Sequence, residues 1–446
     1  MKKYLNPDTT YSLPSELKVV EHRNQFLVIA PMTASWIVLP SEKHIEILRE
    51  FSNGLSIADL TNRFPAHQEE LREVVTQLEA RRFCNRKVRS ATSDFKTLHL
   101  YLTNKCNLSC PHCYMFSGSP NQEELTTSEI LTLVKNYAEA GGKRVTFSGG
   151  EPSVHKDFDK IVEEVYALGL KVRILTNGSL FDKERIMRLA HMIDSIQISI
   201  DGFSEETNSI IRGKGHFLKA LMAVDGFIKQ GVNVSVGVTP PYSLLEAHID
   251  DYAKFAKQLG DKYGSHKILI KFSEGLLEGR DVCPTQSSNQ KYFNLMQELN
   301  KKLHGSNYEL VSFVHAVKQN VIMDNCMFGV FAVCSNGDVY FCARVAGLQP
   351  CANVRTTPFD EIVRLSNEAE KATVIDNLKP CKSCELRYIC GGGCRIDEFP
   401  NLVNRSSFAN VDLDSMEGRS CPPGLKTKFY DLMIQSNPYL YSQTED

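Results

Sequence analysis

The sequence lacks the features that would place the protein in a membrane or on nucleic acid. Nowhere do its 446 residues reach the roughly 18 uninterrupted apolar residues of a membrane span, and the closest stretch, Phe26 to Leu39, is broken by Pro31 and Ser35. The two lysines near the start have no apolar stretch behind them, so we expect no secretory signal. The 51 basic residues nearly balance the 53 acidic ones, so no overall field draws the protein to nucleic acid or anionic lipid.

Cysteine, in contrast, is abundant. The chain has 14 cysteines, and 42% of its residues are hydrophobic, which is typical of a folded globular protein. Without an export signal the expected location is the cytoplasm, where disulfides are rare and clustered cysteines more often bind metal. The cysteines are therefore the first guide to function.

Hydrophobic patterning divides the chain into three expected domains. Residues 1–92 contain three short apolar runs and then helical spacing, with Ser41 and Ser56 as expected N-caps, which indicates a winged-helix-like domain. Residues 93–310 alternate strand and helix patterns six times, which predicts an α/β fold with a parallel sheet, either an open barrel or a doubly wound sheet. In residues 311–446 the alternation stops and nine cysteines appear, so we expect metal to hold this region together.

The first cysteine cluster follows the first strand of the α/β region. Cys106, Cys110 and Cys113 have C-x3-C-x2-C spacing, and three thiolates on one loop can each hold one iron of a 4Fe-4S cube. One iron is then left without a protein ligand. A zinc site is the alternative, but zinc loops usually pair two C-x2-C units, and the local candidate for a fourth ligand, His112, is expected to point away.

This loop, with the aromatic Tyr114 behind it and six βα units around it, resembles the radical S-adenosylmethionine (SAM) superfamily. The resemblance implies a partial six-fold (β/α) barrel whose open iron chelates SAM. An electron from the cluster then cleaves SAM to a 5'-deoxyadenosyl radical, which abstracts a substrate hydrogen. The cluster ligands are the only catalytic groups that the resemblance assigns.

The resemblance also implies a set of SAM-binding residues after successive strands. Gly149, Gly150 and Glu151 match a motif that bonds the SAM amino group, and Arg212 resembles an arginine that pairs with its carboxylate. Alternatives are a plain Gly-Gly-Glu-Pro turn and a surface arginine. The remaining implied contacts are Tyr114 on adenine, Thr176, Asn177, Ser199 and Asp201 at strand ends, and Val238, which could equally be core.

The C-terminal cysteines resemble a SPASM domain, which carries auxiliary iron–sulfur clusters behind some radical SAM cores. A zinc ribbon is the alternative, although a ribbon needs only four ligands. By this resemblance one 4Fe-4S cube is held by Cys381, Cys384, Cys390 and Cys421, and a second by Cys326, Cys342 and Cys394.

The fourth ligand of the second auxiliary cube stays open. Cys283, Cys334 and Cys351 are candidates, and Cys334 could instead be a buried apolar residue. If none of them binds, the cube has an open iron that could take a substrate thiolate. With the SAM-binding cube, the implied cofactors are SAM and three 4Fe-4S clusters.

The N-terminal domain must be weighed against DNA binding, the commonest role of a winged helix. Residues 1–92 hold 13 basic and 11 acidic residues, and their one basic cluster follows the last helix instead of lying in a recognition helix. The domain instead resembles the peptide-recognition domain of ribosomal peptide maturases, in which a leader peptide adds a strand to an exposed sheet edge. We therefore expect a precursor peptide as partner, and no nucleic acid.

The expected function is modification of a ribosomally made precursor peptide by a radical SAM oxidoreductase. The favoured product is a thioether from a cysteine sulfur to a carbon of another residue. The alternatives are a carbon–carbon cross-link between side chains, formylglycine formation in a sulfatase, and a non-enzymatic DNA-binding redox sensor. A flavodoxin- or ferredoxin-like protein is the expected electron donor, and the sequence does not identify the peptide, its bonded atoms or the oligomeric state.

Overall fold

The N-terminal unit is an antiparallel sheet followed by three helices. The computed structural model describes residues 6–91, 97–121, 123–264, 266–317, 321–404, 407–408, 418 and 420–440. The unit comprises β1 (Lys18–His22), β2 (Gln25–Ala30), the 3-10 turn η1 (Pro31–Thr33), β3 (Ser35–Leu39), α1 (Glu42–Ser52), α2 (Ile57–Arg63) and α3 (Gln68–Ala80). Ser56 caps α2 through a full capping box with Asp59, as expected. Ser41 is the N-cap of α1, but its side chain makes no cap hydrogen bond.

The α/β region forms the expected parallel sheet. Its strands are β5 (Thr97–Tyr101), β6 (Arg144–Ser148), β7 (Lys171–Thr176), β8 (Ile193–Ser199), β9 (Asn233–Val238) and β10 (Ile268–Phe272), each parallel to the next. Its helices are α4 (Thr127–Glu139), η2 (Pro152–Val154), α5 (Phe158–Ala167), α6 (Lys183–Leu189), η3 (Ala190–Met192), α7 (Glu205–Arg212), α8 (His216–Lys229), α9 (Tyr242–Ala247), α10 (Ile249–Tyr263) and α11 (Gln286–His304). α9 and α10 are separated at His248, whose ψ of 32° lies outside the helical range.

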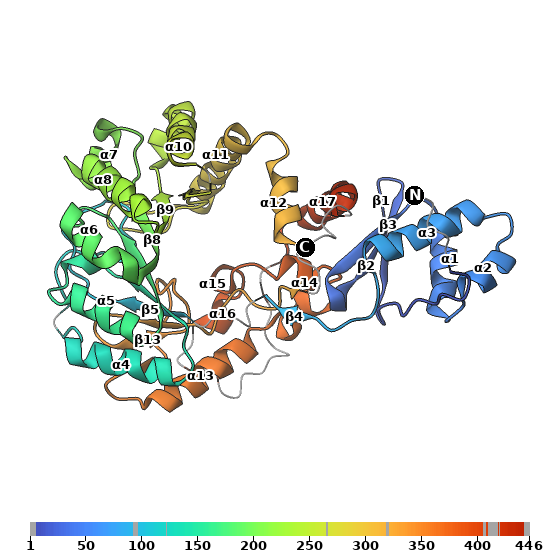
Figure 1. The fold of residues 1–446 in the computed structure, drawn as a ribbon, viewed down its shortest axis with the longest axis horizontal. Helices are drawn as coiled ribbons and strands as arrows, with labels where there is room; N and C mark the ends of the chain where they lie inside the picture. The colour runs from blue at the N-terminus through green and yellow to red at the C-terminus, as the bar shows by residue number, and fades with distance from the viewer. Residues whose placement is uncertain are drawn as a thin grey trace.

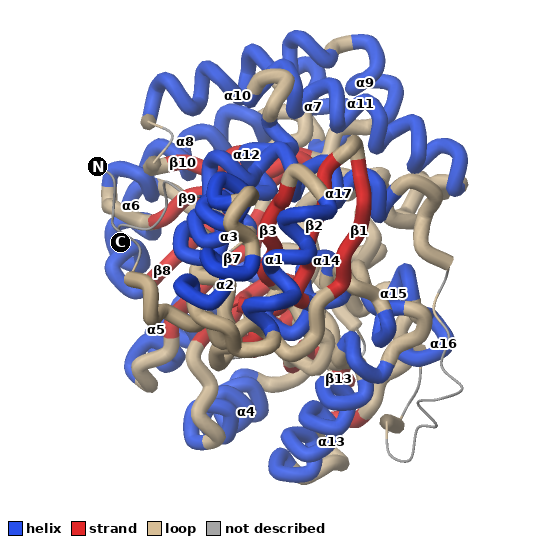
Figure 2. The backbone as a smooth tube through the Cα atoms, turned by 90° about the vertical axis from the view of Figure 1, so that its right-hand side faces the viewer, coloured by secondary structure: helices blue, strands red, loops and turns tan. Residues whose placement is uncertain are grey.

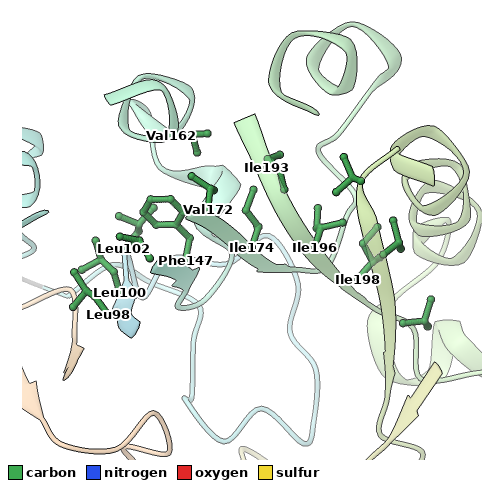
Figure 3. Packing of buried hydrophobic residues seen from close by; sticks show 14 of the residues in the cluster. Leu98, Leu100, Leu102, Phe147, Val162, Val172, Ile174, Ile193, Ile196 and Ile198 are labelled. Atoms are coloured by element: carbon green, nitrogen blue, oxygen red, sulfur yellow. The ribbon is translucent and has the colours of Figure 1, made fainter. Parts of the chain in front are cut away.

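The hydrophobic core lies between this sheet and the helices on its outer side. Figure 3 shows apolar residues of β5 to β8, among them Phe147, Val172 and Ile196, pointing to the side on which α5 carries Val162. Alternate residues of the same strands, such as Arg173 and Gln197, are half-buried and face the opposite side, because side chains alternate along a strand. The sheet therefore has one apolar, helix-covered face and one polar inner face.

The C-terminal region extends this core sheet, which the sequence did not lead us to expect. It contains α12 (Tyr308–Ala316), β11 (Val321–Ile322), β12 (Phe331–Val333), β13 (Asp338–Tyr340), β14 (Ala352–Asn353), α13 (Phe359–Ala372), η4 (Ile375–Asn377), η5 (Cys381–Ser383), α14 (Arg387–Cys390), α15 (Arg395–Glu398), α16 (Pro400–Val403) and α17 (Leu425–Leu440). β12 pairs in parallel with β5, and β13 and β14 follow it, so the sheet has nine strands. Strands of two or three residues are too short to show periodicity, which explains why the pattern did not reveal them.

The three regions pack on one another. β4 (Arg89–Ser90), in the connection after α3, pairs in parallel with β11. One face of the N-terminal sheet packs on α1 to α3, and the other packs on α12 and α17, where Trp36 is fully buried and donates from Nε1 to the Met433 carbonyl at 3.0 Å. Figure 2, which views the molecule from the N-terminal side, shows α12 and α17 beside β1 to β3. The N-terminal unit is therefore packed against the C-terminal region (Figure 1).

Among the described residues no helix has both the length and the apolar character needed to cross a lipid bilayer.

Candidate functional site

The loop that carries the first three cysteines begins at the carboxyl end of β5 and folds back on itself. Cys106 donates its backbone N–H to the Gly118 carbonyl at 3.1 Å, and Cys113 donates to the Cys110 carbonyl at 3.2 Å. The backbone N–H of Ser117 points at the Cys113 sulfur, at 3.4 Å. The local hydrogen bonds thus hold the three thiols on one short turn.

The thiols interact with one another and with three charged side chains. Burial, then Glu151, Cys110 and Cys113, raise the pKa of Cys106 to about 11. Burial also raises the pKa of Cys110, with Asp201 adding to the rise and Arg212 opposing it. The cysteine loop therefore shares one site with residues from the loops after β6 and β8 and with the last residue of α7.

The two glycines after β6 are required by a close approach of two backbones. A Cβ added at Gly149, whose φ is +129°, would lie 2.4 Å from the Thr103 carbonyl oxygen, and one at Gly150 would lie 2.4 Å from that of Lys105. Gly150 N–H donates to the Thr103 carbonyl at 2.8 Å. The glycines thus lock the second loop beneath the cysteine loop, so the Gly-Gly-Glu-Pro segment is more than a turn. A direct contact of either glycine with SAM stays a prediction.

Glu151 organises the strand ends around it. The side chain is fully buried, and its Oε1 accepts from Ser153 N at 3.1 Å, Ser153 Oγ at 2.5 Å and Thr176 Oγ1 at 2.7 Å. Its Oε2 accepts from Asn177 N at 2.7 Å. Because a carboxylate has about four acceptor positions, these four donors occupy it. Glu151 and Thr176 are therefore hydrogen-bonded to each other, and their expected contacts with SAM stay predictions.

Asn177 connects the cysteine loop to a buried histidine. Its Nδ2 donates to Asn107 Oδ1 at 2.9 Å, and its carbonyl accepts from His216 Nε2 at 2.9 Å. Burial, then Arg212, lower the pKa of His216 to about 4, so the ring is neutral at pH 7. Asn208 donates to the other ring nitrogen of His216 at 3.0 Å and accepts from Asp201 N at 3.1 Å. One network therefore runs from the cysteine loop to the end of β8.

Asp201 and Arg212 form a buried ion pair at that end. Arg212 Nε donates to Asp201 Oδ2 at 2.6 Å, and His112 Nε2 lies 3.2 Å from the same oxygen. Burial alone would raise the pKa of Asp201, but Arg212 and His112 lower it to about 2. In the described part of the chain the two terminal nitrogens of Arg212 have no hydrogen-bond partner, so they remain available for a carboxylate.

Three further residues expected to contact SAM lie in different surroundings. Val238 is fully buried and packs in the core, the alternative that the sequence left open for it. Its contact with SAM stays a prediction. Tyr114 hydrogen-bonds Tyr101 and lies near Cys334 and Cys342, so its ring faces the C-terminal region. Its expected contact with adenine stays a prediction. Ser199 is half-buried at the end of β8, on the inner face of the sheet. The ring of His112, which we expected to point away from a metal, pairs with Asp201 at 3.2 Å.

The C-terminal thiols fall into the two sets that the resemblance implies. Burial, then Cys390, Cys384 and Cys421, raise the pKa of Cys381 to about 11. Burial, then Cys326 and Cys394, raise the pKa of Cys342 to about 11. Arg344 donates its backbone N–H to the Cys342 sulfur at 3.4 Å and pairs with Asp397. Ligation of iron by these seven residues stays a prediction.

The candidate fourth ligands lie in three different surroundings. Cys283 is exposed, and Cys334 lies in a small cluster with Tyr101, Met115 and Tyr340. Cys351 lies beside the core, and its sulfur is 3.9 Å from the Gln349 carbonyl. The choice of fourth ligand therefore stays open.

The residues present fit an iron–sulfur cluster with a polar ligand beside it. Three thiols provide the donors that a 4Fe-4S cube takes, and Arg212 offers two free guanidinium nitrogens next to them. Two buried polar atoms on the same loop, His112 Nδ1 and Ser117 Oγ, have no partner in the described part of the chain. Buried polar groups are normally hydrogen-bonded, so these atoms are consistent with a missing polar ligand. Among the described residues no three His, Cys, Asp or Glu side chains are already arranged to hold a single metal ion.

Several residues that build the site were missed from the sequence. Glu124 accepts from Asn104 N at 2.7 Å and from Thr103 Oγ1 at 2.8 Å, and so anchors the start of the cysteine loop. His216 and Arg280 are the others. Glu124, His216 and Arg280 belong to no local motif, so the sequence carries no signal for them.

An open parallel sheet with a three-thiol loop at its carboxyl edge defines a radical SAM core, and the family comparison agrees. Residues 100–256 match the family model of the radical SAM superfamily. The chain therefore carries a radical SAM domain, as the cysteine loop predicted.

Three proteins show what the chain is similar to. An AdoMet-dependent heme synthase of Oleidesulfovibrio alaskensis is 26% identical over 344 residues, which are 72% of this chain and 87% of that protein. The mycofactocin maturase MftC of Mycolicibacterium smegmatis is 28% identical over 317 residues, which are 67% of this chain and 77% of that protein. A solved structure of native anSMEcpe with bound AdoMet and the Cp18Cys peptide has a TM-score of 0.52 and 19% identity, covering 78% of this chain and 98% of that one. This structural likeness establishes the fold.

Proposed function

We propose that the protein is a maturase that uses SAM to install a cross-link in a ribosomally made precursor peptide. One observation carries the proposal: the thiols of Cys106, Cys110 and Cys113 lie beside the buried Asp201–Arg212 pair at the carboxyl edge of an open parallel sheet. Active sites of such sheets lie at this edge. Bound there, a 4Fe-4S cluster and SAM together supply a 5'-deoxyadenosyl radical, which takes a hydrogen atom from the substrate.

The surrounding residues have distinct roles in this proposal. The two free nitrogens of Arg212 bind the SAM carboxylate, because a guanidinium pairs with a carboxylate through two parallel hydrogen bonds. Asp201 and His112 hold Arg212 in place from its other side. Glu151 fixes the ends of β6 and β7, and with Gly149 and Gly150 it sets the height of the cysteine loop above the sheet.

A peptide is the favoured substrate because of what precedes the barrel. One relative is a maturase, and the solved structure of similar fold holds a peptide, whereas another relative is a heme synthase. The N-terminal unit of this chain adds a sheet with an open edge. A small tetrapyrrole needs no such docking sheet, whereas an extended peptide can bind by adding a strand to it.

The open edge is that of β1. The turn at Arg23 and Asn24, both with positive φ, closes a two-residue hairpin, so Val19 and Glu21 direct their main-chain groups away from β2. Val19 is 42% exposed. In contrast, every residue of β3 is buried. We therefore propose that the leader pairs with β1.

Part of the basic cluster that follows α3 serves the fold and is not free to bind DNA. Arg81 is buried, lies over the Trp36 ring at 4.8 Å and donates to the Trp36 carbonyl at 3.3 Å. A side chain held in this way cannot reach a phosphate. This arrangement favours the peptide proposal over a DNA-binding sensor.

Thioether formation is the favoured cross-link. We propose that Cys381, Cys384, Cys390 and Cys421 hold one auxiliary cluster, and that Cys326, Cys342 and Cys394 hold another whose fourth position takes a cysteine of the peptide. The grouping of the thiols supports both sets. If replacing Cys334 or Cys351 by Ala removed this cluster, that residue would be the fourth ligand and the peptide sulfur would bind elsewhere.

The decisive experiment uses anaerobically reconstituted full-length protein with the precursor peptide encoded beside its gene. We expect about twelve irons per chain, three cubes of four, formation of 5'-deoxyadenosine, and a peptide product lighter by two hydrogens with one cysteine resistant to alkylation. A Cys384→Ala variant should still cleave SAM but form no cross-link. A product whose cysteines all remain sensitive to alkylation would favour the carbon–carbon alternative. If the parent protein neither cleaved SAM nor changed the peptide, the maturase proposal would be refuted.

Leader docking is tested on the full chain, because an isolated N-terminal unit would expose Trp36 and Ile29, which α17 covers. Calorimetry should give micromolar leader affinity, roughly −8 kcal/mol, with little dependence on salt. Val19→Pro removes an outward N–H on the edge and should weaken binding, whereas Val19→Ala should not. Steeply salt-dependent binding of duplex DNA without leader binding would support the sensor instead.

A further inference from the structure

A tight turn after β10 presses against the cysteine loop from the opposite end of the barrel. The turn is closed by the hydrogen bond from Gly279 N–H to the Val282 carbonyl, at 2.8 Å. Asp281 donates its N–H to the Pro111 carbonyl at 2.8 Å. Arg280 donates from Nη1 to the Cys110 carbonyl at 3.2 Å and from Nη2 to the Ser117 carbonyl. Two consecutive residues of the turn, Arg280 and Asp281, thus hydrogen-bond the loop.

Gly279 shows how close this approach is. A Cβ added at Gly279 would lie 2.6 Å from the carbonyl carbon of His112 and 2.7 Å from its oxygen. Real Cβ atoms are not found at such distances from backbone, so any larger residue would push the turn off the loop. This close packing of the two backbones fixes the position of the neighbouring Arg280 side chain relative to the cysteine loop.

The two carbonyls that Arg280 bridges lie on either side of Cys113. A planar guanidinium can hold two acceptors at once in a defined geometry, which a lysine ammonium on its flexible stem does not do. Bridging Cys110 and Ser117 fixes the length of chain that carries the third thiol. The same contact places a positive charge beside a loop whose three thiols become anionic when they bind iron.

We propose that Arg280 is a positioning residue for the iron–sulfur site: it sets the spacing of Cys110 and Cys113 and supplies a fixed positive charge that favours the reduced cluster. Neither the sequence pattern nor the family resemblance assigned Arg280 a role. The second half of the proposal rests on the proposed cluster, since a reduction potential depends on the charge near the cluster. The first half concerns the polypeptide alone.

The test compares Arg280→Gln and Arg280→Lys with Arg364→Gln, a control on the exposed face of α13 where Arg364 pairs with Glu361 and Glu368. Hydrogen exchange of the iron-free full chain measures the loop, through the amides of Cys106, Cys113 and Phe116. Both Arg280 variants should exchange about tenfold faster there, because hydrogen bonds to a charged group are among the stronger ones, and the control should match the parent.

The midpoint potential of the SAM-sensitive cluster is measured on reconstituted protein. We expect Arg280→Gln to lower it, because the charge is lost, and Arg280→Lys to hold it near that of the parent. Faster exchange with an unchanged potential in Arg280→Gln would show a merely structural role and overturn the proposal, as would unchanged exchange in both variants. If the proposed peptide chemistry failed, both readouts would remain valid, since neither uses a peptide. If Arg280→Gln did not fold, Arg280→Lys would still decide the exchange prediction.

Discussion

The two cysteine-bearing regions of the molecule are built in opposite ways. The first three cysteines lie within eight positions, on a loop tied by hydrogen bonds to Gly118, Glu124 and Arg280. The C-terminal seven spread from Cys326 to Cys421, among strands and helices that are mostly two to four residues long. The barrel therefore holds the loop of the first three cysteines in place. The C-terminal cysteines must themselves help to hold their region together.

This difference concerns where the free energy of ordering comes from. The loop after β5 sits on a sheet whose core includes Leu98, Leu100 and Phe147, all almost fully buried. Each such side chain contributes roughly 1.5–3 kcal/mol by burial. Around η5 and α14 the apolar clusters are small, and one of them has only three fully buried members, Leu378, Phe399 and Leu402. Metal binding can then supply the folding free energy that the core does not.

The largest expected effect removes the first set alone. In Cys106→Ala/Cys110→Ala/Cys113→Ala, SAM cleavage should fall to the level of a protein-free control, while the melting temperature of the iron-free chain changes by less than about 3 °C. The reason is that the frame of this loop does not depend on its thiols. Product analysis for 5'-deoxyadenosine and calorimetric melting check the two parts. Persistent 5'-deoxyadenosine would show that these cysteines are not the site.

The next prediction removes iron from both regions at once. After chelation, amide exchange in residues 375–404 should rise by on the order of a hundredfold, while the strands β5 to β9 stay protected. The measurement is hydrogen exchange on parent protein before and after chelation, with the barrel as the internal control. Equal loosening of the two regions would contradict the distinction drawn here.

The sequence predicted the α/β region far better than the C-terminal region. Six alternating strand and helix patterns gave β5 to β10 and placed Thr176, Asp201 and Arg212 together, because period and order suffice when strands are long. β12 to β14 could not be found, since three residues show no period, and their parallel pairing with β5 joins segments more than 200 positions apart.

Side-chain direction was the second thing that the sequence could not provide. Tyr114 turns toward Tyr101 and Cys342 because a partner from the C-terminal region lies there. Arg280 reaches Cys110 across 170 positions of chain. Both contacts depend on how the barrel closes and what covers it, which no local motif records.

A smaller effect comes from the neutral histidine in the barrel network. Because the folded-state pKa of His216 is lowered to about 4, below the unfolded value of about 6.5, the unfolded chain binds the proton first. Its stabilising contribution is therefore complete above pH 6.5 and is lost as the pH falls toward 4, by about 3 kcal/mol at most. Replacing His216 by Gln should flatten the dependence of unfolding free energy on pH in that window. Denaturant titrations at pH 7 and pH 5 measure it, and His191→Gln, at an exposed position, is the control.

The smallest expected effect tests the direct link between the two regions. Tyr101 hydrogen-bonds Tyr114, which follows Cys113, and donates to the carbonyl of Ala343, which follows Cys342. Tyr101→Phe keeps the ring and removes the hydroxyl, so it should cost about 1 kcal/mol of unfolding free energy, with Tyr166→Phe on the exposed face of α5 as the control. If the regions are framed independently, exchange should rise near Val339 to Arg344 and remain unchanged at Cys106 and Gly118. The cysteine loop has its own hydrogen bonds to Glu124 and Arg280. If amide exchange rose equally at Cys106 and Gly118, the structure of this loop would depend on the C-terminal region.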